Sequence, residues 1–146
     1  MAGFSPLRST STEEDVLLPI SSNAVTLGDL LELDIGAIAW TDADSGTEHW
    51  QLKAVASETV TTSATDVKCR LVAPGQMWEA ESANSSDTAD NGDRMLLTDT
   101  NTVNNTGTDN TSEEACFLQL GVIGASTDNR IWGVIIPGTG INPDAS

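Results

Sequence analysis

Short apolar runs, bounded by glycine, proline, asparagine or aspartate, dominate this sequence from Val16 onward. Runs of about four to eight residues between turn-forming residues are typical of β-strands, whereas an amphipathic helix needs apolar residues three and four apart over a longer stretch. No stretch of helical length has that spacing, and the short segment 29–33 fits a strand better than a helix. We therefore expect an all-β fold.

The strand pattern recurs along the whole chain. It is found at residues 16–20, 27–33, 36–41, 49–56, 66–73, 76–81, 94–98, 115–123 and 130–136. Many short strands at this spacing predict a small β-barrel or sandwich. Two polar stretches, 82–93 and 100–114, contain few apolar residues and are expected to be long exposed loops.

Alternation within the runs predicts which faces are covered. In 66–73 the apolar side chains occupy alternate positions, with Lys68 and Arg70 between them, so one face should cover a core. In 130–136 both faces are apolar, which predicts a central strand. Trp40 and Trp50 lie symmetrically about Ser45, which predicts a hairpin with the two indoles paired across the strands.

The length of 146 residues predicts one domain. We expect an extended N-terminal arm at residues 1–15, a β-barrel domain at 16–137 and a C-terminal tail at 138–146. The arm combines Phe4, Pro6 and Leu7 with serines, threonines and three acidic residues, so we expect it not to pack by itself. Its apolar residues could anchor on another molecule, and a frayed terminus is the alternative interpretation.

The charge balance excludes several classes of partner. There are 22 acidic residues against 6 basic ones, giving a formal net charge of −16 and a pI near 4.1. Nucleic acids and anionic membranes require a Lys/Arg surface, so we expect neither as a partner. No apolar run is long enough for a membrane span, and residues 1–15 lack the apolar core of a signal peptide.

Candidate catalytic residues are few. The sole histidine, His49, has no nucleophile nearby in the sequence, and no phosphate-binding glycine motif occurs. Glu79 and Glu81 would share one strand face about 6–7 Å apart, a separation found in glycosidases, and Trp78 beside them could stack on a sugar. A solvated strand face explains the two glutamates better, so we expect no enzymatic activity and no cofactor.

Metal binding has little support in the sequence. Asp42, Asp44 and Glu48 surround Gly46, but an EF-hand started at Asp42 would place glycine at position 5 instead of 6. The aspartates around Gly92 have ordinary turn chemistry. Cys69 and Cys116 lack metal-ligand spacing and are expected to be free buried thiols. We therefore predict no metal site.

The order of several segments is similar to that of a known family. It comprises a polar arm, then TLGDLLELD (26–34), a strand ending in Trp40, QMWEA (76–80), a long Asn/Asp/Thr stretch, CFLQLG (116–121) and RIWGVII (130–136). This arrangement resembles the head decoration (cement) proteins of tailed bacteriophages, the lambda-type group with a β-tulip or compact β-barrel fold. The similarity extends over residues 1–137 and consists of the order of the patterns.

The resemblance implies a non-enzymatic virion protein. It would be made in the host cytoplasm and bind the outer surface of the expanded head as a homotrimer, with the major capsid protein as its partner. The family's arm adds a strand to that partner, a role that would fall on the first fifteen residues. The arm contacts would be Phe4, Ser5, Pro6, Leu7 and Arg8.

Contacts between subunits are harder to assign. Lys68, Arg70, Trp78 and Arg130 are the candidates. Lys68 and Arg70 are unusual in so acidic a chain, and they would meet carboxylates on a neighbour or relieve charge locally. The alternative function is a carbohydrate-binding module of a phage tail or fibre, in which Trp40, Trp50 or Trp78 would stack on glycan.

Overall fold

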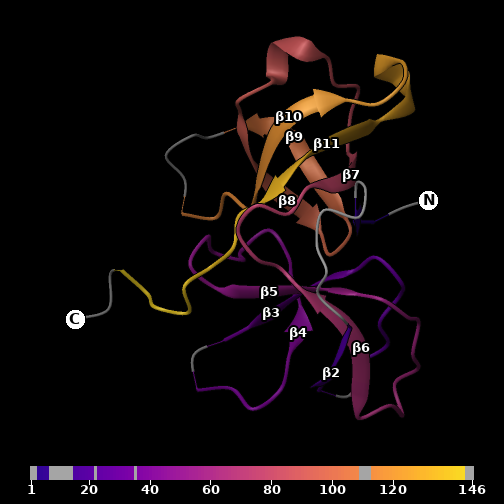
Figure 1. Cartoon of the computed structure of the whole chain (residues 1–146), viewed down its shortest axis with the longest axis vertical. Coiled ribbons are helices and arrows are strands. Elements are labelled where there is room, and N and C mark those ends of the chain that lie inside the picture. Colours follow the sequence, from indigo (N-terminus) through magenta and orange to yellow (C-terminus); the bar gives the residue numbers. More distant parts are fainter. Residues whose placement is uncertain (1–2, 7–14, 22, 35, 109–112, 144–146) are drawn as a thin grey trace.

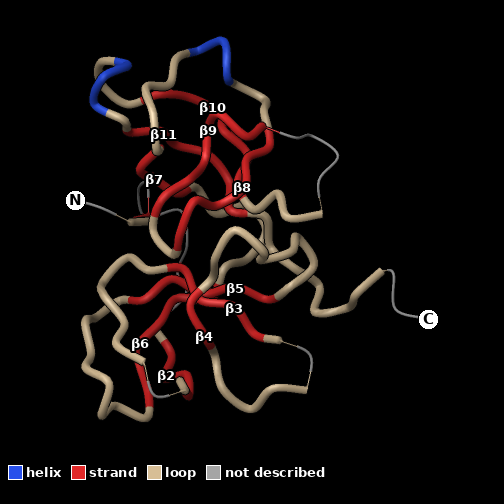
Figure 2. Tube along the Cα trace, turned by 180° about the vertical axis from the view of Figure 1, so that it is seen from behind, coloured by secondary structure: helices blue, strands red, loops and turns tan. Residues whose placement is uncertain are grey.

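The computed structural model describes residues 3–6, 15–21, 23–34, 36–108 and 113–143. In these ranges the regular elements are strands, apart from two single-turn 3-10 helices, Thr88–Asp90 and Ser126–Asp128 (Figure 2). The strands are β1 (Ser5–Pro6), β2 (Val16–Pro19), β3 (Leu30–Leu33), β4 (Thr41–Asp42), β5 (Leu52–Ala56), β6 (Asp66–Leu71), β7 (Trp78–Ser82), β8 (Arg94–Asp99), β9 (Thr102–Thr108), β10 (Phe117–Val122) and β11 (Arg130–Ile135). The expected all-β class is confirmed.

The C-terminal half of the chain forms a closed five-stranded barrel. Its strands follow the order β7-β11-β10-β8-β9, and a parallel pairing of β9 with β7 closes the ring. One edge of β7 is taken by β11, so β1 and β9 must share the other edge. β1 pairs with Trp78 and Glu79, and β9 pairs further along with Glu81 and Ser82. The N-terminal strand thus fills the part of the β7 edge that β9 leaves open.

The N-terminal half forms a second, curled sheet in the order β2-β6-β5-β3-β4. All of its neighbouring strands are antiparallel. A single bridge between Ile20 and Trp40 brings the two outer strands together, so the sheet curls into a half-barrel. Figure 1 shows the two sheets as two lobes, with β2 to β6 in one and the strands from β7 onward in the other. The predicted small β-barrel is therefore confirmed, and the curled sheet adds a second lobe that the sequence did not indicate.

The two lobes share buried side chains. One core cluster fills the curled sheet and includes Leu31, Ala54 and Val67. The other cluster fills the barrel, and it also takes in Leu30 and Val55 from the opposite face of the curled sheet. Neighbouring residues along β3 and β5 point to opposite faces of the sheet, so alternate side chains enter one core cluster or the other. The lobes are thus packed together over a common apolar contact.

Several strand predictions are confirmed. Residues 30–33 form β3 and not a helix, and β11 lies centrally between β7 and β10. In β6 the side chains of Val67 and Cys69 are buried and that of Lys68 is exposed, as the alternation predicted. Leu71, the last residue of β6, departs from the pattern at 40% exposure.

The predicted pairing of Trp40 with Trp50 is wrong. β4 begins at Thr41 and pairs with β3, which lies between β4 and β5, and residues 36–39 are not in a strand. Trp40 instead bridges to Ile20, and Trp50 precedes β5 and donates an indole hydrogen bond to Glu48. Symmetry about Ser45 identifies a turn, but a turn of this length does not require its two flanks to pair with each other.

The polar segment 100–114 also differs from its prediction. Residues 102–108 form β9, which pairs with both β8 and β7 and carries the fully buried Val103. Main-chain pairing on both edges holds this strand, so it needs only a little apolar burial; residues 109–112 lie outside the described part. The segment 83–93 is a loop as expected, although Ser86 within it is buried.

The terminal segments are part of the fold where the structure describes them. Phe4 is 2% exposed and packs against Phe117, with ring centroids 6.1 Å apart. The alternative interpretation as a frayed terminus is wrong for residues 4–6, because Phe4 is buried and residues 5–6 pair with β7. At the other end, Gly140 N–H donates to the Trp50 carbonyl, and a side chain at Gly138 would collide with the Gln51 carbonyl. The expected tail therefore starts as a packed segment.

Candidate functional site

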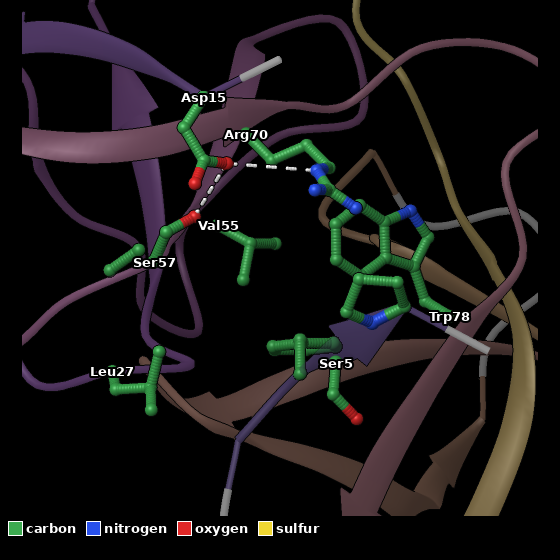
Figure 3. Close-up of a pocket in the computed structure, with 10 residues that line it drawn as sticks. Ser5, Asp15, Leu27, Val55, Ser57, Arg70 and Trp78 are labelled. Carbon is green, nitrogen blue, oxygen red and sulfur yellow. Dashed lines mark hydrogen bonds and ion pairs between the residues drawn. The ribbon is translucent and has the colours of Figure 1, made fainter. Parts of the chain in front are cut away.

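A pocket of about 280 Å3 lies where the N-terminal strand meets both lobes. Its walls come from β1, β5, β6 and β7, together with residues beside β2 and the turn before β3 (Figure 3). The lining residues are Phe4, Ser5, Pro6, Asp15, Leu27, Val55, Ala56, Ser57, Arg70 and Trp78. A mostly apolar concave site with a few polar groups is the usual form of a binding site.

Local backbone geometry fixes the N-terminal wall of this pocket. Phe4 N–H donates to the Gly28 carbonyl at 2.9 Å, and Gly28 N–H donates to the Ala56 carbonyl at 2.9 Å. A Cβ on Gly3 would lie 2.7 Å from the Gly28 oxygen, and both glycines have φ near +90°. Glycine is needed at this crossing because only glycine adopts that φ without strain and leaves room for the approach.

Strand register supplies the opposite wall. Val55 on β5 and Arg70 on β6 are directly opposite each other, so their side chains lie on the same face of the curled sheet. That face is turned toward the barrel, where Trp78 on β7 is 1% exposed. Arg70 therefore points into the junction between the lobes, whereas the side chain of Lys68, two residues earlier on the same strand, is exposed.

The polar groups of the pocket are incompletely paired. Asp15 accepts a hydrogen bond from the Ser57 hydroxyl at 2.9 Å and lies 3.7 Å from Arg70 Nε, as the dashed lines in Figure 3 show. At that distance the Arg70 guanidinium and the Asp15 carboxylate form an ion pair, but the two atoms are too far apart for a hydrogen bond. Within the described residues, Arg70 Nε and Trp78 Nε1 are buried N–H donors with no acceptor. Buried donors of this kind are rare in folded proteins.

The structure brings together five of the nine residues that the sequence analysis proposed as contacts. Phe4, Ser5, Pro6, Arg70 and Trp78 all line the pocket. Leu7 and Arg8 lie outside the described residues, and the side chain of Lys68 is exposed on β6.

The ninth residue, Arg130, lies apart on the barrel. Its Nε donates to Glu79 Oε1 at 2.9 Å, and its Nη2 forms an ion pair with the same oxygen at 2.9 Å, across neighbouring strands. The Glu79 carboxylate is thus engaged in an ion pair beside Glu81. This arrangement supports the structural interpretation of the two glutamates over a catalytic one.

Cysteine and metal chemistry are limited in the described part of the chain. Cys69 and Cys116 are free and buried, as predicted, and burial raises the pKa of each thiol to about 12. Such thiols are protonated and unreactive at neutral pH. Among the described residues, no three His, Cys, Asp or Glu side chains are grouped so that they could hold a metal ion.

Sequence reasoning missed the buried lysine, Lys53, which is 1% exposed. Its Nζ donates to the carbonyls of His49, Gln51 and Ile136 at 3.1, 2.9 and 3.0 Å. Burial lowers the pKa of Lys53, while Cys116 and Glu32 oppose that shift. The position of Lys53 in an otherwise apolar run, LKAVA, was the only sign of this in the sequence.

Glu32 lies directly opposite Lys53 in the register of β3 and β5. Burial raises its pKa above 4.5, and repulsion from Asp34 and Asp44 adds to the shift. A hydrogen bond from the Thr47 hydroxyl and the charge of Lys53 act in the opposite direction. The folded protein therefore binds the Glu32 proton more tightly than the unfolded chain does.

This shift predicts a pH-dependent effect of Glu32→Gln. A raised folded-state pKa means that the stability contributed by this group is present at low pH and is lost as the pH rises through the folded pKa. We expect the stability of the Gln variant relative to wild type to be greater at pH 7 than at pH 4, measured by urea unfolding. A difference in stability that is equal at the two pH values would contradict the assignment.

The sequence was also compared with known proteins. No protein-family model matches the chain, and no curated protein matches it. In the described residues, the helices are too short and too polar to cross a bilayer.

Proposed function

We propose that this chain is a capsid decoration protein of a tailed bacteriophage. In this proposal it binds the outer surface of the expanded head as a homotrimer, contacts the major capsid protein and stabilises the shell. It is made in the host cytoplasm and ends on the virion. The observation that carries the proposal is the convergence of N-terminal residues and body residues on one pocket. A partner segment bound there would contact both lobes and the N-terminal strand at once.

The surface chemistry supports a structural role. A net charge of −16 keeps copies of the protein, and particles coated with it, from sticking to one another. Exposed apolar side chains such as Leu17 and Ile38, 64% and 92% exposed, are available for contacts with other proteins. Symmetric attachment at many sites would make such modest contacts strong in combination.

The carbohydrate-binding alternative has less support. Stacking on a sugar needs an exposed indole face, and Trp40, Trp50 and Trp78 are only 6%, 9% and 1% exposed. Trp40 belongs to the core of the curled sheet and Trp78 to the core of the barrel. These three rings therefore contribute to the fold and offer no stacking platform.

The test is binding of the purified protein to expanded heads that lack it, scored by co-sedimentation. Deleting residues 1–15 is unsuitable, because it removes Phe4 from the core at a cost of about 3–5 kcal/mol of stability. The double variant Leu7→Asp/Arg8→Glu alters the predicted arm contacts without touching the core residue. We expect about a tenfold or greater loss of affinity.

The matched control is Thr61→Ala, an exposed side chain in the loop between β5 and β6. We expect it to bind heads as wild type does. If the Leu7/Arg8 variant also reaches wild-type occupancy, the arm has no role in attachment. If wild-type protein does not bind heads at all, the decoration function is wrong.

A further inference from the structure

We propose that the pocket beside β1 binds a peptide, taking up one large apolar side chain together with a neighbouring main-chain carbonyl. This inference rests on the proposed function, because it specifies the chemistry of the partner segment. The pocket is bounded by Ser5, Val55, Arg70 and Trp78, which the close-up shows around a common space (Figure 3).

The walls and the size select an apolar side chain. Phe4, Pro6, Leu27, Val55, Ala56 and Trp78 contribute apolar surface on several sides. Sites for drug-sized ligands enclose roughly 300–1,000 Å3, so a space of about 280 Å3 is at the lower limit and suits a single side chain. The pocket is open to solvent on one side, so a large apolar side chain there would be partly buried and would contribute less than full burial in a protein core does.

The unpaired donors select a hydrogen-bond acceptor. Arg70 Nε–H and Trp78 Nε1–H are both buried and lack partners among the described residues, and both residues line the pocket. Both groups are already desolvated and unsatisfied without a ligand, so the preference for an acceptor comes from the hydrogen bond that it would add. An acceptor atom next to the apolar group would pair with the Arg70 guanidinium, whose side chain borders the space in Figure 3.

Charge selects a neutral acceptor over a carboxylate. Asp15 already lies 3.7 Å from Arg70 Nε and balances the guanidinium, so the pocket has no excess positive charge. The whole chain carries −16, which disfavours bringing in another anion. An amide carbonyl satisfies the donors without adding charge. An apolar side chain beside an amide carbonyl is the repeating chemistry of a peptide.

Three small probes separate these requirements. N-acetylphenylalaninamide has the aromatic side chain and neutral carbonyls, N-acetylglycinamide has only the carbonyls, and phenylacetate has the ring and a carboxylate. Titration is followed by the 1H–15N signals of the Trp78 indole and the Arg70 Nε–H, assigned with Trp78→Phe and Arg70→Lys. We expect the phenylalanine amide to shift at least the Arg70 signal at millimolar concentrations, and the other two probes to bind about tenfold more weakly or not at all.

Two variants test the role of Arg70. Arg70→Lys retains the positive charge beside Asp15 but lacks the Nε–H donor, and we expect it to weaken binding of the phenylalanine amide by about tenfold. Lys68→Arg is the control, because Lys68 lies on the same strand with its side chain exposed. We expect this variant to bind the phenylalanine amide with the affinity of the wild-type protein. Equal affinity of the Arg70→Lys and wild-type proteins would contradict the acceptor assignment.

The remaining outcomes test this inference and the decoration function separately. Tighter binding of phenylacetate would make the pocket an anion site, and no signal shift with any probe would mean that the pocket takes no such ligand. Failure of the probes while the protein still attaches to heads would reject this inference alone. Binding of the phenylalanine amide by a protein that never attaches to heads would retain the peptide site and reject the decoration function.

Discussion

Replacing Lys53 with methionine is expected to lower the free energy of unfolding by about 2–4 kcal/mol. The methionine side chain is of similar length and fills the space, so the loss comes from the polar contacts. Three carbonyl groups, those of His49, Gln51 and Ile136, would lose their shared donor. Leaving a buried acceptor without a partner costs about 1–3 kcal/mol, and removal of an unfavourably buried charge offsets part of the sum.

The position of these carbonyls explains why the loss should be large. His49 and Gln51 belong to the segment that leads into β5, and Ile136 directly follows β11 of the barrel. The Lys53 ammonium therefore ties the two lobes together at a point where no strand pairing joins them. We expect the variant to unfold at lower urea concentration and to lose hydrogen-exchange protection first around residues 49–53 and 136–140.

The control for this experiment is Lys68→Met, which changes the same residue type on an exposed strand position. Its effect should remain within about 0.5 kcal/mol, because its side chain contacts water. A loss below about 0.5 kcal/mol for Lys53→Met would show that the three contacts contribute nothing net.

Replacing Gln119 with leucine is expected to destabilise the protein by about 2–4 kcal/mol and to loosen the middle of the loop, residues 86–91. Gln119 lies on β10 and is fully buried. Its Oε1 accepts from the Ser86 hydroxyl at 2.8 Å, and its Nε2 donates to the Asp87 carbonyl and to Asn91 Oδ1, each at 3.0 Å. Leucine would satisfy none of these groups, so the loop would lose its side-chain contacts at Ser86, Asp87 and Asn91, while Asn105 and the main chain of Gln119 still hold its two ends.

Hydrogen exchange and urea unfolding report the two effects separately. Amides of residues 86–91 should exchange much faster in the Gln119→Leu variant, while the barrel strands lose only the protection that follows from lower global stability. The control is Leu120→Ala on the same strand, a side chain that is 36% exposed, with an expected loss of less than about 1 kcal/mol. Unchanged exchange in the loop would contradict the anchoring role of Gln119.

The sequence predicted the strands best where apolar residues alternate or run together. β6, β8, β10 and β11 lie within a few residues of their expected bounds, because their side chains cover a core and the pattern follows from that burial. β9 was missed because its pairing is carried by the main chain, which leaves no apolar pattern beyond Val103. The hairpin at Trp40 and Trp50 was wrong because adjacency in sequence does not specify which strands pair.

The candidate site was predictable in part. The N-terminal residues and Arg70 stood out by position and by charge, but nothing in the sequence indicated that they meet. Their meeting depends on β1 taking the free part of the β7 edge and on a second covered face of the curled sheet. The roles of Lys53 and Gln119 depend on carbonyls and loops distant in sequence, which local patterns do not record.

The central claim is tested most directly by quantitative mass spectrometry of purified phage particles from the source culture, counting this chain against the major capsid protein. We predict roughly one copy of this chain per copy of the major capsid protein, because a decoration protein follows the symmetry of the lattice. A few copies per particle would assign the chain to the tail or fibre instead. Its absence from the particles would contradict a virion function altogether.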